Sequence, residues 1–196
     1  MFEFAISLPF LIAMVVGTFA VGLMFDRSLT QGQLARNAAN MYARGIRFNT
    51  TANKQLLVNA ATGMNLKVDG TGETVVYLTA LTRVPSNANC LVSGSLVPCA
   101  NRGMIVIAQR FIVGNTSVDP SVYGDPGSAN IDSEGNVANY EQQTYARATV
   151  PASISDATNG LGEGEFIYAA DTHHIPTLIR FPGIVAPDKM HTWAYY

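Results

Sequence analysis

The first 48 residues of the chain carry two successive hydrophobic patterns. From Phe4 to Phe25 the sequence contains 22 residues without a charge, and about 20 apolar residues are enough to cross a bilayer as a helix. Beyond this run, apolar residues recur at helical spacing: Leu29, Leu34, Ala38, Met41, Tyr42 and Ile46. These patterns predict one continuous helix from about residue 2 to about residue 48, apolar all round at first and amphipathic afterwards.

The apolar run is typical of a membrane helix rather than of a secretory signal peptide. A signal peptide begins with basic residues and has an apolar core of about 7–15 residues. Here no Lys or Arg precedes Arg27, and the apolar run is longer. Pro9, Gly17 and Gly22 interrupt the run without ending it, and membrane helices tolerate such residues. We therefore expect this segment to anchor the chain in a membrane.

Residues 49–196 carry the patterns of a separate α+β head. Helical spacing predicts a short second helix over 54–64. β-Branched and partly alternating residues predict strands over 74–82, 104–113, 145–150, 165–170 and 192–196. The segment 114–140 is rich in Gly, Pro, Asn, Ser and Asp, which predicts a long irregular loop on the outside of the head. The predicted fold class is α+β, with the long helix of residues 1–48 packed on a small antiparallel sheet.

The two cysteines predict a disulfide. Cys90 and Cys99 lie between the two strongest predicted strands, with Ser93-Gly94 able to turn the chain between them. A hairpin-like loop closed by a disulfide suits an exported protein, whereas two reduced thiols would suit a cytosolic one. The predicted membrane anchor favours export and the disulfide.

Composition and charge exclude two broad classes of protein. Only 13% of the residues are charged, about half the usual share, so a solvated disordered chain is excluded. The formal net charge of −2 provides no basic field for phosphates, so we expect no nucleic-acid partner.

Sites for catalysis or metal binding are not evident in the sequence. His173 and His174 are adjacent, so their side chains diverge and make a poor chelate; we interpret them and His191 as surface or interface residues. The acidic residues of the predicted loop do not match the spacing of an EF-hand and are interpreted as solvated: Asp119, Asp125, Asp132 and Glu134. Nucleophile-elbow and phosphate-loop motifs are missing. We expect no enzyme, no cofactor and no metal.

Two triplets match the N-glycosylation motif. They begin at Asn49 and Asn115, and they matter only if the source organism glycosylates exported proteins.

The N-terminal residues carry a family resemblance. The segment Glu3-Phe4-Ala5-Ile6-Ser7-Leu8-Pro9-Phe10-Leu11 is followed by an apolar stretch and by Arg36-Asn37-Ala38-Ala39 and Tyr42-Ala43-Arg44-Gly45. Together with the weaker match of Glu165-Phe166-Ile167-Tyr168-Ala169-Ala170, these segments resemble the TadE/TadF-like pilin family, type IV-like pilins of tight-adherence pili. The resemblance implies a structural subunit of an extracellular filament on a bacterial cell surface, built from identical copies.

The resemblance also implies partners and residue roles. A prepilin peptidase would cleave the subunit. The subunit would be held in the inner membrane by its helix until the pilus assembly machinery inserts it into the filament. Glu3 is expected either to lie as an interfacial charge at the helix N-terminus or to pair with the α-amino group of a neighbouring subunit and fix the register. Phe4 belongs to the same motif, and the surroundings of Pro9 and Gly17 are expected to bend or melt locally. The family carries this glutamate at the fifth mature position, whereas it is third here.

Two other functions stay open at this stage. The first is a minor or tip pilin, or a pseudopilin of a secretion system, with the same fold. The second is a binding or enzymatic domain on a single-pass membrane anchor that never polymerises. A simple anchor requires neither the amphipathic continuation from Leu29 to Phe48 nor Glu3, so the sequence favours the pilin hypotheses.

Overall fold

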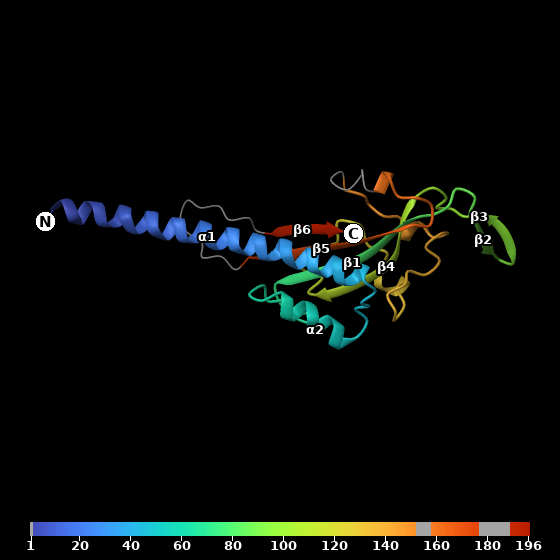
Figure 1. Cartoon of the computed structure of the whole chain (residues 1–196), viewed down its shortest axis with the longest axis horizontal. Coiled ribbons are helices and arrows are strands. Elements are labelled where there is room, and N and C mark those ends of the chain that lie inside the picture. The colour runs from blue at the N-terminus through green and yellow to red at the C-terminus, as the bar shows by residue number, and fades with distance from the viewer. Residues whose placement is uncertain (1, 152–157, 177–188) are drawn as a thin grey trace.

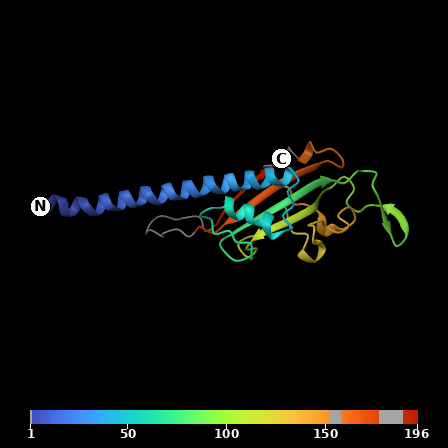
Figure 2. The same ribbon diagram turned by 60° about the horizontal axis from the view of Figure 1, so that its bottom comes forward.

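The computed structural model describes residues 2–151, 158–176 and 189–196, with side chains described from Leu8 onward. It contains one long helix, one short helix, a four-stranded antiparallel sheet and a separate two-stranded hairpin (Figure 1). The predicted α+β class is therefore confirmed. The C-terminal half of the long helix lies along the sheet, and its N-terminal half projects beyond the head (Figure 2).

The long helix, α1, runs from Phe2 to Ala43 without a break. It ends in a Schellman motif, in which the Ile46 N–H donates to the Met41 carbonyl and the Gly45 N–H donates to the Tyr42 carbonyl. Gly45 takes the left-handed backbone conformation that this motif requires, with φ of 86°. The predicted single helix is confirmed, although it ends earlier than expected because the glycine turns the chain away.

The sheet has the strand order β4-β1-β5-β6, and all neighbouring strands are antiparallel. The strands are β1 (Thr74–Arg83), β4 (Ile105–Gly114), β5 (Phe166–His174) and β6 (Met190–Tyr195). The predictions at 74–82, 104–113 and 192–196 are confirmed within two residues. Strand β5 continues four residues beyond its predicted end, because Asp171 and His173 are polar residues that sequence patterns do not assign to a buried strand.

One face of the sheet is covered by the two helices. Leu34, Ala38 and Tyr42 of α1 pack with Leu57 of α2 (Thr51–Ala60) against inward-facing residues of β1, β4 and β5. Ala38 and Ala39 are fully buried, and their small side chains let the helix lie close to the strands. The helix α2 begins three residues before its predicted start, because the Thr50 hydroxyl caps it by accepting from the Asn53 N–H at 3.3 Å.

The opposite face is covered by the long irregular segment. It contains the 3-10 turn Ser128–Asn130, as a loop prediction allows, yet Val118, Tyr123 and Val137 are fully buried on the sheet. The segment is therefore part of the core as well as part of the surface, in contrast to the expectation of an outward-facing loop. Its apolar residues are too widely spaced to give a periodic signal.

The strand predicted over 145–150 is wrong. Thr144–Ala146 form a 3-10 turn, and Arg147 makes only an isolated bridge to Val106. The chain touches the edge of β4 and then leaves it, and Pro151 lacks the N–H that continued pairing would use. The apolar residues of this stretch instead pack over the face of the sheet.

Strands β2 (Asn89–Val92) and β3 (Ser95–Pro98) form the separate hairpin. Ser93 and Gly94 both have positive φ, 50° and 84°, as a type I′ turn requires. The hairpin lies at the end of the molecule opposite the N-terminus (Figure 1).

We predict that shortening a buried side chain in the packed half of α1 destabilises the head. Leu34 is 1% exposed, so Leu34→Ala should lower the free energy of unfolding by about 2–5 kcal/mol through lost burial and the resulting cavity. Leu29, on the same helix but 67% exposed, is the matched control, and Leu29→Ala should change it by less than about 0.5 kcal/mol. Urea unfolding in detergent micelles, followed by the fluorescence of Trp193, measures both. Equal effects would contradict this packing.

Candidate functional site

The most prominent functional feature is the projecting half of α1. Between Leu8 and Leu29 most large apolar side chains are exposed, with Phe10, Phe19 and Phe25 67–73% exposed. This helix is long and apolar enough to cross a membrane, which by length and composition fits either a membrane anchor or a signal sequence. Burying one such side chain contributes about 1.5–3 kcal/mol, so lipid or other apolar helices must cover this surface.

A shallow apolar groove lies on this half of the helix. It has a volume of about 520 Å³, lies over Thr18 and Gly22, and is bordered by Met14, Phe19 and Leu23. A Cβ atom added at Gly22 would meet nothing within 4 Å, and the Thr18 hydroxyl is occupied by donation to the Met14 carbonyl. Small residues four positions apart let a second helix approach closely in an apolar environment.

The predicted assembly residues all lie on α1. Pro9 and Gly17 lie within the unbroken helix, and the bending or melting expected near them during assembly stays a prediction. Glu3 and Phe4 lie in its first turn, and their side chains are outside the described part of the chain. The proposed pairing of Glu3 stays a prediction.

The helix is fixed to the sheet by a polar contact that sequence reasoning missed. Gln31 is 2% exposed, and its Nε2 donates to the Thr172 carbonyl at 2.7 Å and to the Met190 carbonyl at 3.0 Å. One side chain therefore ties α1 to both β5 and β6. In the sequence Gln31 looks like an ordinary polar residue of the helix, because its partners are carbonyl groups more than 140 residues away.

His173 and His174 are buried, at 2% and 1% exposure, so the expectation that they lie at the surface is wrong. Strand β5 is paired on both sides and covered on both faces, and adjacent residues of a strand point into different layers. His191, on the edge strand β6, is exposed as expected.

The surroundings of His174 favour its neutral form. Its Nδ1 lies 2.8 Å from the Thr74 hydroxyl, which itself donates to the Met64 carbonyl, so Nδ1 must be the donor to Thr74. The other ring nitrogen, Nε2, is buried and has no hydrogen-bond partner among the described residues. Burial lowers the pKa of His174, and the positive charge of Arg27 lowers that pKa further.

His173 lies between two carboxylates on the loop-covered face. Its Nε2 is 3.2 Å from Asp171 Oδ2, and its Nδ1 is 3.4 Å from Asp119 Oδ2. The Asp171 carboxylate also accepts from the Val122 N–H at 2.9 Å, while Lys189 pairs with Asp119 at 3.0 Å. These contacts link the loop segment to β5.

Arg110 extends the same network from β4. Its guanidinium lies over the Tyr77 ring, 5.5 Å from the ring centroid, and donates to the Gly124 carbonyl at 3.0 Å. Burial lowers the pKa of Arg110, although the nearby Asp171 opposes this shift. The Tyr77 hydroxyl donates to the Asp119 carbonyl, and burial raises the pKa of Tyr77 to about 12. The cluster fastens the irregular segment to the sheet.

The arrangement of this cluster does not activate a serine. Ser121 Oγ lies 3.4 Å from Asp171 Oδ1, whereas in a hydrolytic triad the serine hydroxyl is hydrogen-bonded to the histidine. In the described residues Ser121 also accepts from the Tyr123 N–H, which places its hydroxyl in the local turn.

The disulfide between Cys90 and Cys99 is confirmed, with the two Cα atoms 5.0 Å apart. Glu141 lies close to both sulfurs, and its Oε2 is 3.9 Å from Cys90 Sγ. Disulfide sulfurs are not thiolates, so these three residues do not form a metal site while the bond is intact.

The two glycosylation motifs differ in accessibility. Asn49 is exposed between the two helices. The side-chain Nδ2 of Asn115, the atom to which a glycan would be attached, donates to the Gly72 carbonyl at 2.9 Å. The structure thus favours Asn49 over Asn115 as an acceptor.

No protein-family model, curated protein or solved structure matches this chain. The pilin resemblance therefore rests on the residues quoted for it, together with the arrangement of helix and head described above.

We predict that the disulfide stabilises the hairpin locally. It closes a loop with a sequence separation of 9, so the double variant Cys90→Ser, Cys99→Ser should destabilise the hairpin by about 2–3 kcal/mol. Among the described strands, β2 and β3 pair with each other and not with the four-stranded sheet, so amide exchange should accelerate in residues 89–98 and stay slow in β1. Hydrogen exchange read by mass spectrometry distinguishes this from global destabilisation, in which β1 would accelerate equally.

We predict that His174 makes the head less stable in mild acid. Above its ordinary pKa of about 6.5, His174 is neutral in both the folded and unfolded states. Below this pH, the unfolded chain binds a proton at His174 that the folded chain does not bind. The free energy of unfolding therefore decreases as the pH is lowered, until the pH reaches the lowered pKa of His174 in the folded state. His174→Gln should reduce the difference in stability between about pH 7.5 and about pH 5.5. His191→Gln, at the exposed edge, should leave that difference unchanged; a reduction in both variants would contradict the assignment.

Proposed function

We propose that the protein is a structural subunit of an extracellular, type IV-like filament, similar to the TadE/TadF-like pilins. The observation that carries this proposal is the division of α1 into a packed half and a bare apolar half within one unbroken helix. A filament needs both: a rigid head with one fixed orientation and an apolar rod that identical rods can cover.

Assembly would proceed without a chemical step by this chain itself. The bare half of α1 lies first in the inner membrane, where lipid covers its apolar side chains. After the prepilin peptidase has cleaved the subunit, the assembly machinery transfers the helix into a bundle of neighbouring helices, and protein surface replaces lipid. The groove over Thr18 and Gly22 provides a place for close helix packing in that bundle.

Glu3 would set the register of each new subunit. A carboxylate in an apolar bundle is costly unless it is paired, so a contact with the α-amino group of a neighbour is satisfied at one axial position only. The rigid connection of α1 to the sheet through Gln31 then gives each head the same orientation around the filament.

The two alternatives differ from this proposal in the number of copies per filament and in whether Glu3 must pair with a neighbour. A minor or tip pilin uses the same helix contacts but is present in few copies. A membrane-anchored domain needs the apolar residues of α1 but no charge pairing within them.

We predict that Glu3→Gln abolishes filament assembly and leaves membrane insertion intact. The substitution keeps the shape of the side chain and removes the charge that fixes the register, so sheared filaments should fall at least about tenfold. Asp26→Asn, at the other end of the same apolar run, is the matched control and should assemble normally. The measurement is the amount of this chain in the sheared and the membrane fractions of the producing cells, with electron cryo-microscopy of the sheared fraction.

Other outcomes would select the alternatives. If the wild-type chain stays in the membrane fraction, the proposal is wrong and the anchored domain is favoured. If it is found in filaments only at trace level, it is a minor subunit.

A further inference from the structure

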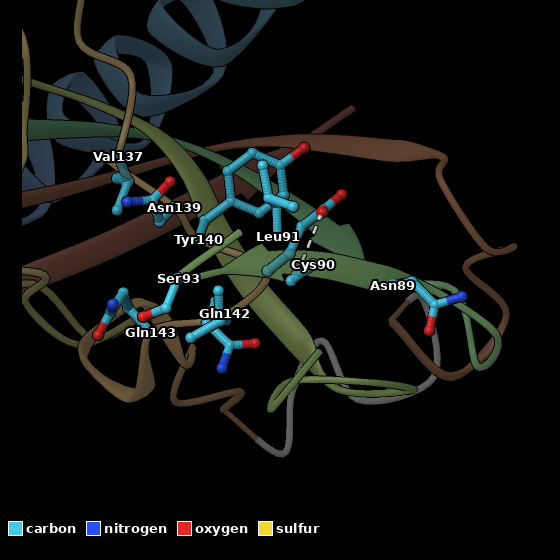
Figure 3. Close-up of a pocket in the computed structure, with 11 residues that line it drawn as sticks. Asn89, Cys90, Leu91, Ser93, Val137, Asn139, Tyr140, Gln142 and Gln143 are labelled. Carbon is cyan, nitrogen blue, oxygen red and sulfur yellow. Dashed lines mark hydrogen bonds between the residues drawn. The ribbon is translucent and has the colours of Figure 1, made fainter. Parts of the chain in front are cut away.

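A groove of about 750 Å³ lies between the disulfide-closed hairpin and the segment 137–143 (Figure 3). This volume is within the range of about 300–1,000 Å³ that is typical of small-molecule sites. Leu91 of β2 and Tyr140 provide apolar surface on its walls. The groove is separate from the helix surface on which the proposed assembly depends.

The lining of the groove is dominated by amide side chains. Asn89, Asn139, Gln142 and Gln143 line it, and an amide side chain carries both a hydrogen-bond donor and an acceptor. The Asn89 oxygen already accepts from Arg102 and the Gln142 oxygen from the Ala100 N–H, so the complete donor–acceptor pairs are those of Asn139 and Gln143. Glu141 adds a carboxylate acceptor, and neither Lys nor Arg is among the described lining residues. Such a lining offers paired donors and acceptors together with a single negative charge.

The backbone under these side chains is held in place. The N–H groups of Gln142 and Gln143 donate to the Asn139 carbonyl at 2.9 and 3.0 Å. Nδ2 of the buried Asn101 donates to the carbonyls of Tyr140 and Gln143 at 2.8 and 2.7 Å. The disulfide fixes the opposite wall. The site is therefore built before any ligand arrives, which reduces the entropy cost of binding.

Several side chains keep unused hydrogen-bonding groups that face the groove. Within the described part of the chain, the amides of Asn139 and Gln143 and the hydroxyl of Tyr140 have no hydrogen-bond partner in the protein. The Asn139 backbone has a φ of 48°, a conformation that asparagine adopts more readily than most residues. These groups are free to bind a ligand.

From this chemistry we infer that the groove binds a neutral saccharide. Each sugar hydroxyl both donates and accepts, so neighbouring hydroxyls match the paired groups of an amide side chain. The C–H face of a sugar ring can pack on the ring of Tyr140 and on Leu91. A phosphate or another anionic ligand would meet Glu141 without a compensating cation, and a purely apolar ligand would leave the amides unpaired at a cost.

Binding in this groove does not depend on filament assembly. The groove belongs to the hairpin end of the head, opposite the N-terminus of α1, and would be complete in a single subunit (Figure 1).

The test uses the full chain in lauryldimethylamine oxide micelles, because maltoside detergents carry a sugar that could occupy the groove. Saturation-transfer NMR with cellotriose, chitotriose and maltotriose, each at millimolar concentration, measures binding. The groove variants are Tyr140→Phe, which removes only a hydroxyl, and Gln143→Ala. The matched controls outside the groove are Tyr195→Phe on β6 and Gln55→Ala on α2, and thermal unfolding verifies that all four fold.

We expect at least one trisaccharide to bind the wild-type chain. The affinity for that trisaccharide should fall about three- to tenfold in each groove variant, because one hydrogen bond is lost. It should stay unchanged in both controls. Absence of binding by all three trisaccharides overturns the inference, as does binding that the groove variants leave unaltered. Preference for a sulfated trisaccharide over its neutral parent also overturns it. The amount of sheared filament is a separate measurement that does not depend on saccharide binding. Absence of saccharide binding can therefore be distinguished from failure of the proposed filament function.

Discussion

The packing of the second half of α1 on the sheet determines the arrangement of the rest of the molecule. Leu34, Ala38 and Tyr42 fill the space above β1, β4 and β5, while Gln31 binds the backbone of β5 and β6. Because the helix continues without a break, this contact also fixes the direction in which the apolar half projects. A flexible joint between anchor and head would still hold the protein at a membrane, but it would not define the position of one head relative to another.

The other face of the sheet is organised by charge as well as by apolar burial. Arg110, Asp171 and His173 are buried there, and taking polar or charged groups out of water is unfavourable unless each finds partners. The partners come from the irregular segment, through the Val122 N–H, the Gly124 carbonyl and the Asp119 carboxylate. A segment with little regular structure thereby gains a defined position, because most of these polar groups would be costly to bury without it.

The two ends of the molecule are suited to different tasks. At one end, an apolar helix must be covered by lipid or by other helices. At the other, a disulfide-closed hairpin and a hydrogen-bonded turn border a polar groove. The proposed assembly surface and the proposed binding groove lie at opposite ends, so one subunit could do both without competition between them.

The elements that can be predicted from the sequence are those whose signals are local. The uncharged run 4–25, the alternating residues of β1 and β4, and the cysteine pair are signals carried by residues close together in the chain, so they can be recognised in the sequence alone. The projecting helix could be predicted for the same reason. Three features depend on partners that are distant in the chain and are visible only in the fold: the anchoring by Gln31, the burial of His173 and His174, and the groove at the hairpin. A polar side chain looks the same in a sequence whether water or a distant carbonyl satisfies it, and the fold alone makes that choice.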